Sequence, residues 1–253
     1  MRKNSKKRDF RNYLDVPIIN TLDVQEMDLA SAKERIADFV GGLLPYFLII
    51  FCFMGSMYPA IDLAAGEKER GTLETLLTSP VSRMQILLGK FGVVVLTGIV
   101  SACFSFLGLY IGIRRAGEIP PELLKTLLGI LEPESIALLI SLLFPLTIFF
   151  AALMLSLSIF ARSFKEAQSY ISPLMIVIII PAFLGLLPGM ELNSLTAWIP
   201  IFNVTLTTKA IIAGHMETML IVKTYLSCFI LAAVSLFICS KIFSHESVIF
   251  RST

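Results

Sequence analysis

The amino-acid sequence predicts an all-α membrane protein, a polytopic bundle of about five transmembrane helices. Two observations predict this class. Apolar residues make up 56% of the 253 residues and charged residues only 16%, whereas a soluble domain carries about 25% charged residues. The charges also gather in a few short segments. Between them lie apolar runs that reach the roughly 20 helical residues needed to cross the hydrocarbon layer of a bilayer.

The helices can be placed in order along the chain. Ser31-Ala-Lys-Glu34 fits a capping box, in which the serine and the glutamate side chains each accept a hydrogen bond from a free amide. The first helix is therefore expected to begin there and to continue into the membrane. The predicted spans cover about residues 41–64, 86–113, 135–160, 170–187 and 219–243. Residues 190–214 are less apolar and contain Trp198, which favours the headgroup layer, so a short helix is expected near the membrane surface or dipping into it.

Residues 1–40 are expected to form an N-terminal extension ahead of a single membrane domain, residues 41–253. The start of the chain is strongly basic, but no apolar segment follows it closely, so it is not expected to be a signal peptide. The net charge of the whole chain is only +2. Overall electrostatics therefore give no reason to expect nucleic acid as a partner.

Neither a metal site nor a catalytic site is expected. His215 and His245 have no partner at ligand spacing, and we interpret both as solvated or interfacial. The cysteines all fall inside apolar runs and lack the spacing of a metal site, so they are expected to be small buried hydrophobic residues. They are Cys52, Cys103, Cys228 and Cys239.

The segment between the first two predicted spans is rich in charge and predicts a short surface helix. Glu67, Arg70 and Glu74 are spaced at i,i+3 and i,i+4, and each such pair stabilises an exposed helix by about 0.2–0.5 kcal/mol. Ser79 followed by Pro80 is typical of an N-cap with proline at the first helical position, so a second helix is expected to start there. The residues alone leave two interpretations open: an ordinary charged loop, or a lever that a soluble partner grips and pushes.

The sequence GEKERGTLETLLTSPVSRMQILLGK, residues 66–90, resembles the signature segment of the ABC-2 class of transporter permeases, closest to the sodium-extrusion (NatB-like) branch. The resemblance covers the chain from about residue 23 to its end. It is strongest in three further stretches: LPYFLIIFCFMGSMYPAIDLAAGEKERGTLETLL (residues 44–77), ARSFKEAQSYISPL (residues 161–174) and IPIFN (residues 199–203).

The resemblance implies that this segment is a cytoplasmic coupling helix that docks against an ABC ATP-binding subunit. The matching positions are Glu67, Lys68, Glu69, Arg70, Gly71, Thr72, Leu73 and Glu74, with Pro80, Arg83 and Lys90 downstream. ATP and Mg²⁺ would then bind in the partner subunit, and this chain would be a transport subunit rather than an enzyme. The sequence agrees, because it contains no GxxxxGK[ST] phosphate-binding loop.

The resemblance also carries expectations about the start of the chain and its orientation. Relatives of this branch begin with an additional span and an extracytoplasmic domain, so residues 1–40 are expected to be a remnant of that domain. A truncated gene is slightly favoured over a companion chain that supplies the missing part. The implied orientation places residues 67–90 inside. Lys and Arg in the short connections support it modestly, although the basic N-terminus argues the other way.

The leading functional hypothesis is the permease subunit of an ABC exporter in a prokaryotic plasma membrane. It would move sodium or another small cation as a homodimer, or as a heterodimer with a related permease, surrounded by membrane lipid. Asp62 is a weak candidate for the cation path, and a solvated or lysine-paired end charge is the simpler interpretation of it. The alternatives are a truncated, non-functional fragment, a membrane scaffold without transport, and an intramembrane protease. The last is disfavoured because no paired carboxylates or histidines lie at membrane depth.

Overall fold

A computed structural model describes residues 32–115, 133–187, 189–212 and 217–244. All regular structure in these ranges is helical, which confirms the predicted all-α class. Within the described residues, five helices are long and apolar enough to cross a membrane, as predicted. They are Gly42–Glu69, Arg83–Gly112, Ser135–Phe160, Phe164–Leu184 and Thr218–Phe243. Most of residues 1–40, together with His215 and His245, lie outside the described residues.

The first span combines α-helical and π-helical segments. Its main part, α2 (Ala32–Ile61), begins directly after the predicted N-cap Ser31 and contains two prolines. The π-helical turn η2 (Asp62–Gly66) and the short α3 (Glu67–Glu69) continue it without a break. The backbone then turns at Gly71, whose φ of +70° lies in the left-handed region that glycine adopts readily.

The remaining helices follow after this turn. They are α4 (Thr72–Leu77), α5 (Arg83–Arg115), α7 (Pro133–Phe160), α8 (Phe164–Leu184), η3 (Thr196–Trp198), α9 (Phe202–Ile212) and α10 (Thr218–Ser244). The fourth span starts at Phe164 rather than near residue 170. The short helix expected within residues 190–214 is present as η3 and α9, and α9 is largely buried in the bundle.

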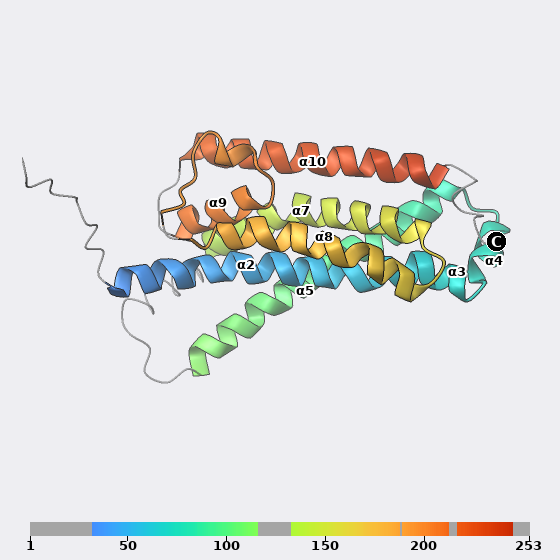
Figure 1. Cartoon of the computed structure of the whole chain (residues 1–253), viewed down its shortest axis with the longest axis horizontal. Helices are drawn as coiled ribbons and strands as arrows, with labels where there is room; N and C mark the ends of the chain where they lie inside the picture. Colours follow the sequence, from blue (N-terminus) through green and yellow to red (C-terminus); the bar gives the residue numbers. More distant parts are fainter. Residues whose placement is uncertain (1–31, 116–132, 188, 213–216, 245–253) are drawn as a thin grey trace, which may run out of the picture.

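Figure 1 shows α2, α7, α8 and α10 running along the long axis of the molecule. The elements α3 and α4 lie at one end, and α9 lies toward the other. The last part of α5 points away from the bundle. We call the end that holds α3, α4, the start of α5 and the α7–α8 connection the charged end, and the end that holds η3 and α9 the far end.

The two helices α2 and α5 approach closely because glycine and serine face each other. A Cβ atom added at Gly55 would lie 2.4 Å from the Cβ of Ser101, and one added at Gly98 would lie 2.3 Å from the hydroxyl oxygen of Ser56. The Ser101 hydroxyl also donates to the carbonyl oxygen of Phe51 at 2.9 Å. Small residues that let backbones approach, joined by serine hydrogen bonds, are the usual contacts between membrane helices.

The cysteine prediction is correct at three positions and wrong at one. Cys52, Cys228 and Cys239 are buried. Cys103 is exposed, because it lies on the side of α5 that no other described element covers. An apolar run shows that a residue lies in a span, but it does not show which side of the helix faces the protein and which faces lipid.

Candidate coupling site

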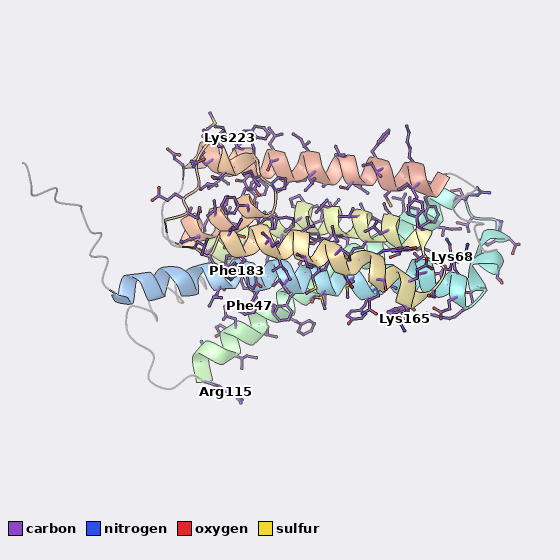
Figure 2. All side chains as sticks on the ribbon, viewed as in Figure 1. Phe47, Lys68, Arg115, Lys165, Phe183 and Lys223 are labelled. Atoms are coloured by element: carbon purple, nitrogen blue, oxygen red, sulfur yellow. The ribbon has the colours of Figure 1, made fainter. Side chains whose placement is uncertain are left out.

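The residues that resemble the coupling segment gather at the charged end. Lys68 and Lys165 lie together at this end in Figure 2, whereas Arg115 and Lys223 lie toward the opposite end. The site is built from four pieces of chain: the end of the first span, α4, the first turns of α5, and the connection between α7 and α8. Its charged side chains contact the end of the first span, α5 and the α7–α8 connection.

The first tie joins α5 to the end of the first span. The ammonium group of Lys90, in α5, donates to the carbonyl oxygen of Leu63 at 2.5 Å and forms an ion pair with Glu67. The Lys90 side chain is only 7% exposed, and a buried charge is tolerated in proteins when it is paired and hydrogen-bonded. Glu67 therefore fixes the π-helical turn against α5 and has little surface left for a partner.

The second tie is a pair of contacts that we call the helix clasp. Lys68 donates to the carbonyl oxygen of Ile159 in the last turn of α7. Its neighbour Glu69 accepts a hydrogen bond of 2.8 Å from the amide of Phe164, the first residue of α8. Helix C-termini carry unpaired carbonyls and favour cations, and N-termini carry unpaired amides and favour anions. Two adjacent residues of opposite sign thus hold the two helix ends that face each other across the α7–α8 connection.

The α7–α8 connection is itself rigidly organised. Ser163 caps α8 by accepting a hydrogen bond of 3.2 Å from the amide of Glu166. The Glu166 carboxylate accepts from the Arg162 amide at 2.7 Å and from the Tyr170 hydroxyl. Sequence reasoning noted this stretch only as part of the family resemblance. The spacing of Ser163 and Glu166, which is that of a capping box, would have identified the start of α8.

The predicted pair of Glu67 with Arg70 is wrong, and the predicted pair of Arg70 with Glu74 falls on a side chain that lies outside the described residues. Arg70 forms an ion pair with Asp62, and Glu67 is taken by Lys90. The prediction assumed a continuous α-helix, but the turn of Asp62–Gly66 is π-helical and the helix ends before Gly71. The side chains of Asp62 and Arg70 meet over Gly66. A Cβ atom added at Gly66 would lie 2.9 Å from a carboxylate oxygen of Asp62 and 2.9 Å from a guanidinium nitrogen of Arg70. Asp62 thus has an arginine partner, and its role in a cation path stays a prediction.

The predicted start of a second helix at Ser79 is also wrong, because α5 begins at Arg83. Ser79 donates to the carbonyl oxygen of Leu76 at 2.7 Å and so closes the end of α4. The N-cap of α5 is Ser82, whose hydroxyl accepts from the Gln85 amide at 3.3 Å while the Gln85 side chain accepts from the Ser82 amide at 3.0 Å. This reciprocal pair is a capping box. Pro80 lies in the exposed turn between the two helices.

Part of the exposed surface at the charged end is a short strip of chain around α4, and Arg162 and Lys165 are exposed beside it. The side chains of Leu73 and Glu74 lie outside the described residues, and Arg83 is partly exposed as the first residue of α5. The exposed residues of the strip are Glu69, Arg70, Gly71, Thr72, Thr75, Thr78, Pro80, Val81 and Ser82. We call this strip the docking strip. It is exposed at the surface, while its base is tied to three spans by Lys90, Lys68 and Glu69.

Comparison with known proteins identifies the family. The model of the family described as "ABC-2 family transporter protein" matches residues 12–240. The ABC transporter permease protein NatB of Bacillus subtilis (strain 168) is 26% identical over 220 residues, covering 84% of this chain and 55% of NatB. The chain thus spans about half the length of this curated relative. No solved structure gives a significant match. Because the family match extends over most of the chain and five candidate spans lie in its described residues, the chain belongs to the ABC-2 family and is a multi-pass membrane protein.

Proposed function

We propose that this permease subunit exports a small cation, with sodium as the first candidate, using ATP hydrolysed on a separate ATP-binding subunit. The docking strip is the contact surface for that subunit. The observation that carries the proposal is the helix clasp. A strip open to a partner is connected through adjacent charges to the ends of two spans, and through Glu67 and Lys90 to a third.

The contacts support a simple route for mechanical coupling. A displacement of the docking strip also displaces Lys68 and Glu69, and these residues hold the last turn of α7 and the first turn of α8. The partner supplies the energy, because it binds ATP and Mg²⁺ and changes shape on hydrolysis. The permease needs only two arrangements of its helices, whose populations the partner shifts by binding them with different affinity.

Cargo and assembly are the less constrained part of the proposal. Sodium is suggested by the resemblance to the sodium-extrusion branch and by the match to NatB, which this chain covers over 55% of its length. A path between two copies of the chain, or between this chain and a related permease, would provide the conduit. The plasma membrane is the proposed location, with the docking strip on its cytoplasmic side.

Coupling can be tested by reversing one charge of the clasp. The ATP-binding subunits of the source cell that lack a membrane domain of their own are purified. Each is reconstituted with this chain in vesicles, and the stimulation of its ATP hydrolysis is measured. Glu69→Lys should abolish stimulation while the protein still inserts and folds, because a cation would then face the amide end of α8. Arg115→Gln, at the other end of α5, is the matched control. Unchanged stimulation by the Glu69→Lys protein would refute the coupling route.

The cargo is tested separately in inside-out vesicles. ATP-dependent accumulation of radioactive sodium is compared with that of rubidium, a potassium analogue, at equal concentration. Sodium accumulation that depends on this chain supports the proposal. Coupled ATP hydrolysis without accumulation of either ion would keep the coupling route and reject the cation.

A further inference from the structure

An apolar groove lies between α5 and α10 close to the charged end. Its volume is about 320 Å³, within the size range of small-molecule sites in proteins. One wall is a stripe of α5 that includes Met84, Leu88 and Phe91, and the other is formed by Leu236 and Phe237 of α10. The spacing of the α5 residues, i, i+4 and i+7, places them on one side of that helix. The groove therefore runs along the helices for about 10 Å.

Both walls of the groove belong to candidate membrane spans, Arg83–Gly112 and Thr218–Phe243. The groove thus opens toward the hydrocarbon layer rather than toward water. No described part of the chain covers it, because Leu88 is 56% exposed and Phe237 is 63% exposed. An occupant that comes from the bilayer has to be a flexible apolar chain.

Two cations mark the end of the groove that lies nearest the membrane surface. The ammonium group of Lys241 lies over the ring of Phe237, 5.2 Å from the ring centroid. Arg83 is the first residue of α5 and directly precedes the groove residue Met84. Ser240, which also lines the groove, adds a hydroxyl donor. Basic residues at the cytoplasmic ends of membrane helices favour anionic lipid headgroups.

We propose that this groove binds one anionic phospholipid. An acyl chain lies between α5 and α10, and the phosphate is held near Arg83 and Lys241. The apolar walls account for the chain and the two cations account for the charge of the headgroup. The site would brace α5 beside the docking strip, but its existence does not depend on whether the protein transports a cation.

The test uses the fact that the chain contains a single tryptophan, Trp198, which lies in η3 at the far end. In a Trp198→Phe background, Phe237→Trp places a probe in the groove wall, and Phe229→Trp places one on the same helix outside the groove. Each protein is reconstituted in vesicles of phosphatidylcholine with a minor share of phosphatidylglycerol. Only one of the two lipids carries bromine on its acyl chains, which quenches nearby tryptophan.

We expect brominated phosphatidylglycerol to quench the groove probe more strongly than its share of the lipid predicts. The excess should be about fivefold for each cation that contacts the headgroup. The Phe229→Trp probe should follow the bulk composition. Adding Lys241→Gln should reduce the excess at the groove about fivefold, whereas Lys223→Gln, at the other end of α10, should leave it unchanged (Figure 2).

Two results would overturn the proposal. Equal preference at the Phe237→Trp and Phe229→Trp probes would show that the groove does not select a headgroup. A groove probe that neither brominated lipid quenches would show that protein covers the groove, as a second copy or a partner subunit would. Bromine at the same acyl position in both lipids removes the effect of depth from each comparison.

Discussion

The two ends of the bundle differ in the chemistry that holds them. At the charged end, Lys68, Glu69 and Lys90 make ionic or charge-assisted contacts between helices. At the far end the buried contacts between the described helices are neutral, and the ammonium group of Lys223 donates to the Ser194 hydroxyl at 2.8 Å only at the exposed surface. The buried amide of Asn203 in α9 donates to the carbonyl oxygen of Ala197 at 2.8 Å and to the hydroxyl of Ser227 in α10 at 2.5 Å.

The far end continues this neutral pattern along α9. Thr207 and Thr224 share a hydrogen bond of 2.9 Å between α9 and α10, and both are fully buried. Ile201, just before α9, adopts a φ of +71°, a conformation that is strained for a β-branched residue and persists only where the surroundings impose it. Neutral buried bonds specify one arrangement. The exposed charges of the docking strip, Glu69 and Arg70, lose little when they exchange partners, so this strip is better suited to change shape than the buried contacts of the far end.

The largest effect is expected from breaking the buried ion pair between Lys90 and Glu67. Lys90→Met leaves the Glu67 carboxylate, whose side chain is 19% exposed, without its partner. Removing one member of a buried pair costs about 3–5 kcal/mol, and the partial exposure of Glu67 favours the lower value. The free energy of unfolding in mixed micelles measures the loss. Lys90→Met combined with Glu67→Leu should recover most of it, and a failure to recover would mean that Leu63 is the more important partner.

The next largest loss of stability is expected where α2 and α5 approach closely. Gly55→Ala brings a methyl group to 2.4 Å from the Cβ of Ser101, and overpacking of this kind costs about 1–3 kcal/mol. Gly108→Ala, where the added Cβ has no neighbour within 4 Å, is the control and should be neutral or slightly stabilising. Equal melting temperatures for the two variants would show that the helices do not pack this closely.

A smaller loss is expected at the far end. Asn203→Leu removes the donor to Ala197 and Ser227 and should cost about 1–2 kcal/mol, since interhelical hydrogen bonds in membrane proteins are individually modest. Its effect should appear in hydrogen exchange of α9 and leave ATPase stimulation intact. If stimulation fell as strongly as with Glu69→Lys, the division between an adaptable end and a fixed end would be incorrect.

The smallest effect on stability is expected for Arg70→Gln. The side chains of Arg70 and Asp62 are 58% and 50% exposed, and exposed pairs contribute about 0–1 kcal/mol. The melting temperature should shift little, and the shift should shrink further in high salt. A salt-independent loss as large as that of Lys90→Met would show that this pair is part of the buried network.

The sequence was sufficient to predict the all-α class and the five candidate spans of the described residues, because apolar runs of span length seldom occur outside membrane helices. It placed the start of α8 too late, because Lys165 and Glu166 in its first turn hid the helix from a prediction based on hydropathy. The local pairing at the charged end was missed for a different reason. Residue spacing predicts partners within one regular helix. Glu67 instead forms an ion pair with Lys90, and Glu69 accepts a hydrogen bond from the amide of Phe164, each in another helix.

The helix clasp depends on the order of Lys68 and Glu69 in the sequence. Lys68 meets the negative pole of α7 and Glu69 meets the positive pole of α8. Exchanging them, as in Lys68→Glu with Glu69→Lys, would preserve composition, net charge and hydropathy, yet each side chain would then confront a pole of its own sign. The contacts at this junction therefore depend on the order of the positive and the negative residue along the chain, rather than on the amount of charge.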